Sequence, residues 1–322
     1  MPYIHPSRLE FVVTDACTGR CRHCGEGERE SHGQSVDREA AVRAVKSLAG
    51  RYAIESVMTF GGEPLLRADT VCAIHAAARD CGIPERQIIT NGFFSKDERR
   101  IDQVAKALCE AGVNDILVSV DCFHQEFIPV APVVQFAQAL LRYDAPRLRA
   151  HPVWVVNEEH ENPYNAGTKR ILEIFTGLGM ERSAGNNIGP SANAVKHLGE
   201  YFDPPGKIDL SQPCGSMPYT APLDDVRCVC VNPDGEVRLC GIGIGNICRD
   251  DILDIVDRYD PYANPAARAV LTGGVAALLE YAAGQGIAVD TSGCRSACGV
   301  CRRAMGACGP AVGCAAPADK GM

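Results

Sequence analysis

The stretch VVTDACTGRCRHCGEG (residues 12–27) places three cysteines directly after a run of apolar and β-branched residues. Cys17, Cys21 and Cys24 have C-x3-C-x2-C spacing, and no fourth cysteine follows in register. Three kinds of site explain such a loop: a zinc knuckle, a disulfide fragment, or a three-thiolate site with a vacant fourth position. His23, between two of the cysteines, is a further candidate ligand. The rest of the chain has to decide among them.

Length and composition limit the choice. The chain has 322 residues, 46% of them hydrophobic, and a formal net charge of −8, which predicts one large domain plus an appendage, or two domains. This mildly acidic balance gives no electrostatic footprint for nucleic acid or an anionic membrane surface. No apolar run suggests a bilayer span and no signal peptide is evident, so we expect a cytoplasmic protein without membrane or nucleic-acid partners. Seventeen cysteines in a reducing compartment then indicate metal binding rather than disulfides.

Residues 8 to about 190 alternate between strand-like and amphipathic helical patterns. Such alternation predicts an α/β fold with a parallel sheet and outer helices, here a partial (β/α)6 barrel of the TIM type. The predicted strands are 8–14, 54–60, 86–90, 115–120, 151–156 and a weak sixth at 180–189; the predicted helices are 35–50, 67–82, 99–112, 132–143 and 167–179.

Polar residues follow each predicted strand. In a parallel α/β sheet the carboxyl ends of the strands meet at one face, where functional sites are built. We therefore expect a polar pocket around a metal at this face. Its predicted lining after the second to fifth strands is Gly61, Gly62 and Glu63, then Thr90 and Asn91, then Ser119, Asp121 and His124, and finally Asn157.

The three-cysteine loop, followed by Gly-Gly-Glu (61–63) after the second strand, resembles the radical S-adenosylmethionine superfamily over roughly residues 8–190. The resemblance implies a [4Fe-4S] cluster on Cys17, Cys21 and Cys24, with its open iron chelated by S-adenosylmethionine. It also implies cleavage of that cofactor to a 5′-deoxyadenosyl radical that abstracts a substrate hydrogen. The electron would come from an external one-electron reductant such as flavodoxin or ferredoxin.

The same resemblance implies roles for the strand-end residues. Gly61 and Gly62 would let the backbone approach the cofactor, and Glu63 would accept a hydrogen bond from its amino group. Contacts to the ribose hydroxyls or the carboxylate would come from Ser119, Asp121 and Asn157, with Thr90 and Asn91 as positioning groups. His23 stands where the family often has an aromatic residue near the adenine.

The last third of the chain holds ten cysteines. Residues 224–247 predict a β-hairpin about Asn232–Glu236, with Cys228 opposite Cys240 and Cys230 on the same face. The Gly235-x4-Cys240 and Cys298-x2-Cys301 spacings are similar to the SPASM and twitch extensions. These extensions hold auxiliary iron–sulfur clusters.

We therefore expect at least one auxiliary [4Fe-4S] cluster, with a zinc site as the alternative. The predicted domains are a barrel over 1–200, a SPASM/twitch-like domain over 201–309 and a loose tail over 310–322. The candidate auxiliary ligands are Cys214, Cys228, Cys230, Cys240, Cys294, Cys298, Cys301 and Cys308.

Two functions stay open at this point. One is a maturase that modifies a peptide or protein substrate by epimerisation, cross-linking or formylglycine formation. The other is an enzyme of a cofactor or small-molecule pathway on the same scaffold. For an epimerase, Cys122 beside Asp121 is a candidate hydrogen donor, as is any of Cys214, Cys228, Cys230 and Cys248 that is not a ligand.

Overall fold

The computed structural model describes residues 2–202, 208–217 and 220–309. The predicted tail, with Cys314, lies outside the described residues. The chain divides into two compact units. We call them the barrel unit (Ser7–Asp203 and Cys230–Gly235) and the cysteine-rich unit (Met1–Pro6, Pro204–Val229 and Glu236–Met322).

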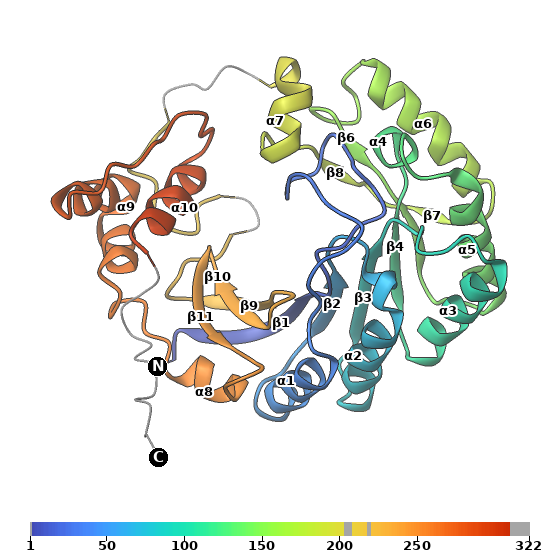
Figure 1. Cartoon of the computed structure of the whole chain (residues 1–322), viewed down its shortest axis with the longest axis horizontal. Helices are drawn as coiled ribbons and strands as arrows, with labels where there is room; N and C mark the ends of the chain where they lie inside the picture. Colours follow the sequence, from blue (N-terminus) through green and yellow to red (C-terminus); the bar gives the residue numbers. More distant parts are fainter. Residues whose placement is uncertain (1, 203–207, 218–219, 310–322) are drawn as a thin grey trace. The chain divides into compact units, whose positions relative to one another are not determined.

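The barrel unit has the predicted α/β architecture with a parallel sheet (Figure 1). Its strands follow the order β1-β2-β3-β4-β5-β7, and each runs parallel to its neighbours. A second, two-stranded parallel sheet pairs β6 with β8. The strands are β1 (Ile4–Val12), β2 (Ser56–Phe60), β3 (Glu85–Thr90), β4 (Asp115–Ser119), β5 (Leu148–His151), β6 (Val153–Trp154), β7 (Glu181–Arg182) and β8 (Asn186–Asn187).

Helices follow the strands and cover the outer face of the sheet (Figure 1). Helix α1 begins after Asp37, whose carboxylate caps the helix by accepting a hydrogen bond from the Ala40 N–H at 2.7 Å. The helices are α1 (Arg38–Arg51), η1 (Pro64–Arg67), α2 (Ala68–Asp80), α3 (Glu98–Glu110), α4 (Cys122–Gln125), α5 (Val130–Arg142), α6 (Pro163–Thr176), α7 (Ala192–Leu198) and η2 (Gly199–Tyr201).

The fifth and sixth predicted strands differ from the structure. The fifth, expected at 151–156, begins earlier as β5 and is interrupted at Pro152, which has no N–H to donate to a sheet. The sixth is divided into β7 and β8. Between them Gly185 has φ +76, and a Cβ there would lie 2.3 Å from the Pro152 carbonyl oxygen. Only glycine fits this close crossing.

The two faces of the main sheet differ because side chains alternate along each strand. The face toward the helices is apolar, and several of its side chains have no exposed surface: Val57, Ile88, Ile116, Val118 and Ala150. These residues form the core of the unit. Burying each large aliphatic side chain contributes about 1.5–3 kcal/mol.

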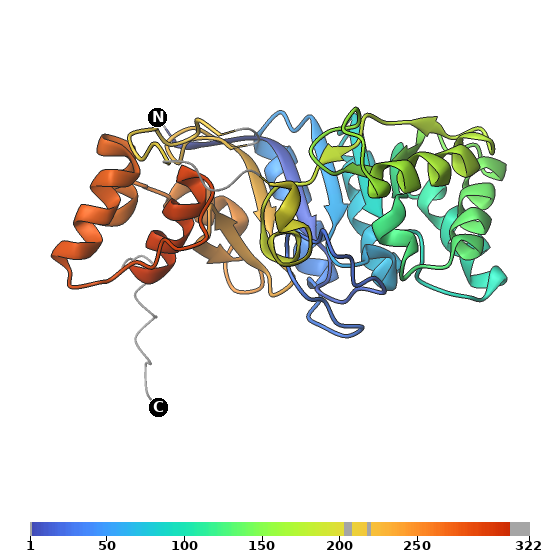
Figure 2. The same ribbon diagram turned by 90° about the horizontal axis from the view of Figure 1, so that it is seen from above.

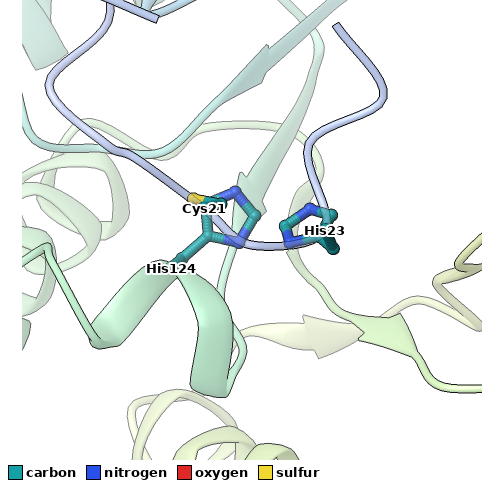
Figure 3. A group of neighbouring side chains, drawn as sticks. All are labelled: Cys21, His23 and His124. Carbon is teal, nitrogen blue, oxygen red and sulfur yellow. The ribbon is translucent and has the colours of Figure 1, made fainter. Parts of the chain in front are cut away.

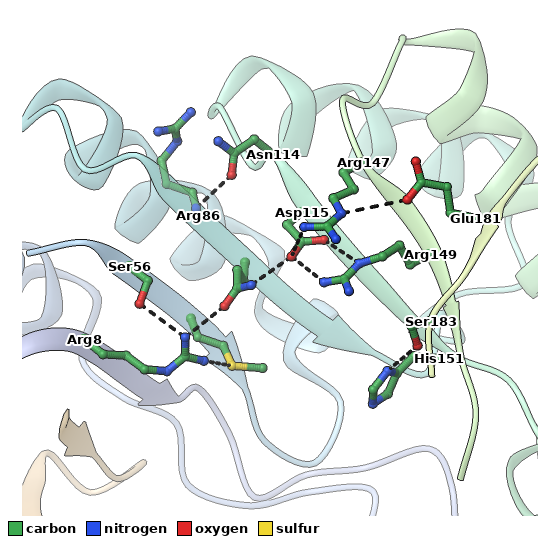
Figure 4. Close-up of polar contacts among 12 residues, drawn as sticks. Arg8, Ser56, Arg86, Asn114, Asp115, Arg147, Arg149, His151, Glu181 and Ser183 are labelled. Carbon is green, nitrogen blue, oxygen red and sulfur yellow. Dashed lines mark hydrogen bonds and ion pairs between the residues drawn. The ribbon is translucent and has the colours of Figure 1, made fainter. Parts of the chain in front are cut away.

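The opposite face carries a polar network across the strands (Figure 4). Arg8 Nη1 donates to Gln87 Oε1 at 2.9 Å, and Gln87 Nε2 donates to Asp115 Oδ2 at 2.8 Å. Arg149 Nε donates to Asp115 Oδ1 at 2.9 Å. Closed barrels fill this side with branched apolar residues. Here the network instead ties together strands β1, β3, β4 and β5.

The predicted hairpin is present, with its turn assigned to the barrel unit, and one further strand follows it in the cysteine-rich unit. The Gly235 N–H donates to the Asn232 carbonyl at 2.9 Å in the turn between β9 and β10. The elements of the cysteine-rich unit are β9 (Val226–Val231, continuing into the barrel unit), β10 (Glu236–Leu239), β11 (Ile242–Asn246), α8 (Ile252–Asp257), α9 (Pro265–Gly284) and α10 (Ala297–Ala307).

Strand β11 was not predicted, and its presence puts Cys240 in a turn instead of a strand. Strands β10 and β11 are antiparallel and are joined by Cys240 and Gly241, with φ of 49° and 87°. Two successive positive φ values are typical of a type I′ hairpin turn. Cys240 therefore lies in a turn, and the expectation of a strand position opposite Cys228 is wrong.

Helix α9 corrects the expectation that no apolar run has the length of a membrane span. By length and composition alone its 20 residues are long and apolar enough to cross a membrane, with a mean hydropathy of 1.2. The helix is interrupted at Gly274, where φ is 71° and ψ is −168°, so neither half approaches the roughly 20 residues that a span needs. Helix α9 packs against α10.

Candidate functional site

A cavity of about 220 Å³ lies at the carboxyl ends of the strands of the barrel unit. The sequence predicted most of its lining, and the structure brings those residues together. The predicted residues that line it are Cys17, Cys21, His23, Cys24, Gly61, Gly62, Thr90, Asn91, Ser119 and His124; those not predicted include Arg20, Arg29, His151, Val153 and Asn186.

The cysteine loop is held by its own backbone and by its neighbours. The Cys17 N–H donates to the Glu30 carbonyl at 2.7 Å, because the chain after the loop returns beside it. The Asn193 N–H of α7 donates to the Cys24 carbonyl at 3.2 Å, and both views show the loop, in dark blue, beside α7 (Figures 1 and 2). The loop is thus fixed at both ends.

The Cys17 thiol is held by hydrogen bonds from two neighbouring groups. Its Sγ accepts from the Gly19 N–H at 3.3 Å and from Asn91 Nδ2 at 3.7 Å. Burial raises the pKa of the Cys17 thiol to about 11, so without a metal this thiol keeps its proton. Metal binding would release that proton.

Gly61 and Gly62 make room for protein backbone, not only for a ligand. A Cβ on Gly61 would lie 2.6 Å from the Thr14 carbonyl oxygen, and one on Gly62 would lie 2.1 Å from that of Ala16. The Gly62 N–H donates to Thr14 at 2.8 Å. The two glycines therefore seat the chain that leads into the cysteine loop, and they also line the cavity.

Glu63 lies beneath the cavity and does not line it. Its side chain is fully buried and accepts hydrogen bonds from the Leu65 N–H at 2.9 Å, Thr90 Oγ1 at 2.6 Å and the Asn91 N–H at 2.8 Å. Burial raises the pKa of this carboxyl to about 7, although the three hydrogen-bond donors act to lower it. In the structure Glu63 joins the ends of β2 and β3, where the resemblance implied a bond to the cofactor.

His23 and His124 lie beside Cys21 (Figure 3). One ligand atom of each residue lies within 4.8 Å of the other two. The Nδ1 of His23 is buried and has no hydrogen-bond partner among the described residues, and burial lowers the His23 pKa to about 4. The ring centroids of His23 and His124 are 5.0 Å apart.

Asp121 orients His124 and does not line the cavity. Its carboxylate is fully buried and caps α4 by accepting from the N–H groups of Phe123 and His124, both at 3.0 Å. It also contacts His124 Nδ1 at 2.7 Å. Burial opposes charge on both groups, yet their pairing lowers the pKa of Asp121 and raises that of His124 well above 6.5.

Two other predicted residues lie outside the cavity lining. Asn157 is exposed, and its Oδ1 accepts from the His160 N–H at 2.9 Å. Cys122 opens α4 with its backbone N–H bonded to Thr168 Oγ1 at 3.2 Å, and its side chain packs toward α6, near Gly167. The hydrogen-donor role of Cys122 stays a prediction.

His151 is a cavity residue that the sequence reading did not assign. It ends β5, two residues after Arg149, on the face that carries the polar network. Its Nδ1 contacts Ser183 Oγ at 2.8 Å (Figure 4), and its Nε2 contacts Asn186 Nδ2 at 3.1 Å. Burial, then the charge of Arg149, lowers its pKa to about 4. A predicted fifth strand that began at residue 148 would have placed His151 near the carboxyl end of that strand and so identified it as a candidate cavity residue.

A second cavity, of about 170 Å³, lies within the cysteine-rich unit. Four thiols line it: Cys214, Cys240, Cys298 and Cys301. Burial, followed by the negative charge of the other three thiols, raises the pKa of Cys301 to about 12. The rest of the lining is mainly apolar and includes Leu223, Val270, Val275 and Met305.

The structure separates these four thiols from the other candidate auxiliary ligands. None of the others lines the second cavity as described: Cys228, Cys230, Cys294 and Cys308. The sequence could not make this selection, because Cys240 reaches the cavity only through the unpredicted turn before β11.

A tetrahedral zinc site, with Zn–S near 2.3 Å, needs sulfur atoms about 3.8 Å apart. Among the described residues, the one set of three candidate ligand atoms within 4.8 Å is that of Cys21, His23 and His124. Neither the three loop thiols nor the four thiols of the second cavity are so close together in this structure.

Comparisons with known proteins identify the domain that holds the cysteine loop. Residues 11–143 match the model of the Radical SAM superfamily. A probable GTP 3′,8-cyclase from Methanocaldococcus jannaschii is 30% identical over 121 residues, 37% of each chain. A GTP 3′,8-cyclase from Actinobacillus pleuropneumoniae is 35% identical over 115 residues, 35% of this chain and 32% of the relative. The matched segment thus spans about a third of these relatives.

Solved structures with a similar fold are more distant. BtrN in complex with AdoMet and 2-DOIA is 16% identical with a TM-score of 0.45, covering 84% of this chain and 88% of BtrN. Streptococcus suis SuiB bound to precursor peptide SuiA is 14% identical with a TM-score of 0.41, and the match covers 83% of this chain and 67% of SuiB. The cysteine loop, the Gly-Gly-Glu turn and the family match together show that the chain carries a domain of the radical SAM superfamily over residues 11–143.

Proposed function

We propose that this radical SAM enzyme modifies a peptide or protein substrate. The observation that carries the proposal is the second cavity, where four thiols meet in the cysteine-rich unit. Such a cavity is what the resemblance to SPASM and twitch extensions implies, and these extensions are common in enzymes that modify peptides. When bound, S-adenosylmethionine and a reduced [4Fe-4S] cluster supply a 5′-deoxyadenosyl radical for hydrogen abstraction.

Cys17, Cys21 and Cys24 would hold the first cluster. Three thiolates leave one iron without a protein ligand, which is the position that the cofactor needs. Gly19 and Asn91 would keep donating to the Cys17 sulfur, and hydrogen bonds to ligating sulfurs tune cluster potentials.

The cavity lining supports a narrower proposal for the cofactor contacts than the sequence does. Of the three residues predicted to bind ribose or carboxylate, Ser119 lines the cavity, so we assign the direct contact to it. Gly61, Gly62 and Asn91 would contact the cofactor from the side of β2 and β3. Asp121 and Glu63 would act indirectly, by holding His124 and the ends of β2 and β3.

The four thiols of the second cavity would hold an auxiliary [4Fe-4S] cluster. Four cysteines complete the ligation of such a cluster and leave no iron open to a small-molecule ligand. This closed ligation favours an electron-transfer role over substrate binding. The Cys214 sulfur, which also accepts hydrogen bonds from the backbone N–H groups of Leu223 and Gly215, resembles a cluster ligand in this respect.

The alternative is a small-molecule reaction of a cofactor pathway. The curated relatives named GTP 3′,8-cyclase favour it, although the similarity covers only 37% and 35% of this chain. Either function needs an external one-electron reductant such as flavodoxin or ferredoxin.

The test uses anaerobically reconstituted enzyme, dithionite and S-adenosylmethionine in deuterated solvent. We would offer GTP and, separately, synthetic peptides encoded by short reading frames beside the gene. A peptide product with solvent deuterium at an α-carbon indicates epimerisation, and a peptide two mass units lighter indicates a cross-link or formylglycine. Consumption of GTP with unchanged peptides would contradict the proposal.

The hydrogen donor is tested in the same assay. If deuterium appears at an α-carbon, Cys122→Ala should abolish that incorporation while 5′-deoxyadenosine still forms, because hydrogen abstraction precedes quenching. The matched variant is Cys109→Ala, on helix α3, which should leave both products unchanged. Deuterium incorporation that survives in Cys122→Ala would move the assignment to Cys228, Cys230 or Cys248.

A further inference from the structure

Two adjacent arginines of α10 have opposite surroundings. The Arg303 guanidinium donates to the carbonyls of Asp290 at 3.0 Å and Ser292 at 2.7 Å, and it lies 3.8 Å from the Asp290 carboxylate. Arg302 lines the four-thiol cavity. Among the described residues Arg302 has no hydrogen-bond, ion-pair or ring partner, so none of these residues compensates its charge.

Arg302 shares this cavity with the four thiols. It directly follows Cys301 in α10, while Cys240 comes from the turn before β11. Its positive charge therefore acts on this group of sulfur atoms. Among the described residues that line the cavity, Arg302 is the cation, whereas Arg303 is held by the segment at Asp290–Ser292.

The surroundings strengthen this interaction. Leu223, Val270, Val275 and Met305 also line the cavity, and charges interact more strongly beside apolar groups than in water. Reduction adds one negative charge to a cluster, and net charge near a cluster is one of the factors that set its potential. A fixed positive charge favours the more negative, reduced form.

We propose that Arg302 raises the reduction potential of the auxiliary cluster and so favours its acceptance of an electron. This inference rests on the proposed auxiliary cluster at Cys214, Cys240, Cys298 and Cys301. Arg302 acts through its positive charge and is not a cluster ligand, since a guanidinium has no acceptor atom to offer iron. Its side chain is exposed, so salt should weaken the effect.

The experiment isolates the auxiliary cluster. In the Cys17→Ala, Cys21→Ala, Cys24→Ala background the remaining cluster signal belongs to the cysteine-rich unit. The midpoint potential is measured by electron paramagnetic resonance during redox titration, for Arg302→Gln, Arg302→Lys and the matched control Arg303→Gln. We expect Arg302→Gln to shift the one-electron equilibrium toward the oxidised form at least threefold, about 28 mV. Arg302→Lys and Arg303→Gln should stay near the parent value.

A second measurement separates charge from structure. The change in midpoint potential caused by Arg302→Gln should shrink between about 0.05 and 0.5 M salt, where the Debye length falls from roughly 14 to 4 Å. An unchanged midpoint in Arg302→Gln, an equal shift in Arg303→Gln, or a shift that salt does not reduce would overturn the inference. Absence of iron from the parent variant would instead remove the auxiliary cluster, and this inference with it.

Discussion

Two residues of the Gly-Gly-Glu turn, Gly62 and Glu63, make close contacts and hydrogen bonds within the protein. Gly62 lies against the Ala16 carbonyl, and its N–H donates to Thr14, while Glu63 receives three hydrogen bonds from the ends of β2 and β3. The turn therefore positions the cysteine loop as well as lining the cavity. At the residue scale, the proposed cofactor contacts and local stability therefore depend on the same turn.

Glu63→Ala should destabilise the chain. The substitution leaves three donors, at Leu65, Thr90 and Asn91, without their acceptor, and an unsatisfied buried polar group costs about 1–3 kcal/mol. We expect the free energy of unfolding of the iron-free chain to fall by roughly 2–4 kcal/mol in urea titrations. Glu110→Ala, at an exposed helix end, should change it by less than about 0.5 kcal/mol. Equal stability of the two variants would show that Glu63 is free to serve the cofactor alone.

Gly62→Ala should displace the cysteine loop. The added Cβ would lie 2.1 Å from the Ala16 carbonyl oxygen, and backbone cannot yield as a flexible side chain can. We expect reconstitution to lose most of the iron of the first cluster, measured per chain beside 5′-deoxyadenosine formation. Gly50→Ala meets nothing within 4 Å and lies in a helix, where alanine is better by about 0.5–1 kcal/mol, so this control should retain both. Full iron content in Gly62→Ala would contradict the close packing.

At the scale of elements, α2 joins the sheet through a buried histidine. His75 is fully buried, and its Nε2 contacts Thr59 Oγ1 of β2 at 2.9 Å. Its Nδ1 has no partner among the described residues. Burial, then the charge of Arg86, lowers the His75 pKa to about 3, so the folded chain keeps this ring neutral.

The contact between α2 and β2 should therefore weaken in acid. Below pH 6.5 the unfolded chain binds a proton at His75 that the folded chain refuses, so the free energy of unfolding falls as pH decreases from about 6.5 toward 3. The slope from one such group is at most about 1.4 kcal/mol per pH unit. His75→Gln should reduce the measured slope between pH 5 and 6.5. His23 and His151, whose pKa values are also lowered to about 4, add to this slope, and Glu63 and His124, whose pKa values are raised, oppose it.

Urea titrations of the reduced, iron-free chain at several pH values measure this slope. His32→Gln is the control, because its side chain is 84% exposed; it should leave the slope unchanged. The same slope in His75→Gln and the parent would mean that His75 is protonated in the folded chain.

At the scale of the whole molecule, the two thiol cavities belong to different units. No cysteine lines both cavities, so each cluster should assemble on its own ligands. We expect about eight iron atoms per reconstituted chain, and about four after Cys17, Cys21 and Cys24 are all replaced by alanine. Replacing Cys214, Cys240, Cys298 and Cys301 instead should also leave about four.

Iron and sulfide analysis with electron paramagnetic resonance distinguishes these variants. Cys228→Ala with Cys294→Ala is the matched control, since neither thiol lines a described cavity, and it should keep about eight. Loss of all iron in the first triple variant would show that the cysteine-rich unit holds no cluster without the barrel site. Loss of iron in the control would place a further ligand outside the four.

The sequence alone determined the barrel and its principal site. Strand and helix periods are local properties, and the carboxyl ends of parallel strands necessarily meet at one face. For this reason Cys17, Cys21, Cys24, Gly61 and Ser119 could be placed together from the sequence. The same reading failed at the fifth strand, where Pro152 interrupts pairing and moves His151 to the cavity.

The tertiary structure alone decided which predicted residues face the cavity and which cysteines of the last third meet. Asp121, Asn157 and Glu63 follow the right strands, yet their side chains are taken up by hydrogen bonds to neighbouring backbone. Spacing in sequence left eight candidate auxiliary ligands. The turn at Cys240 and Gly241 and the course of α10 reduced them to four, because proximity between distant segments depends on chain reversal and helix packing, which no local pattern encodes.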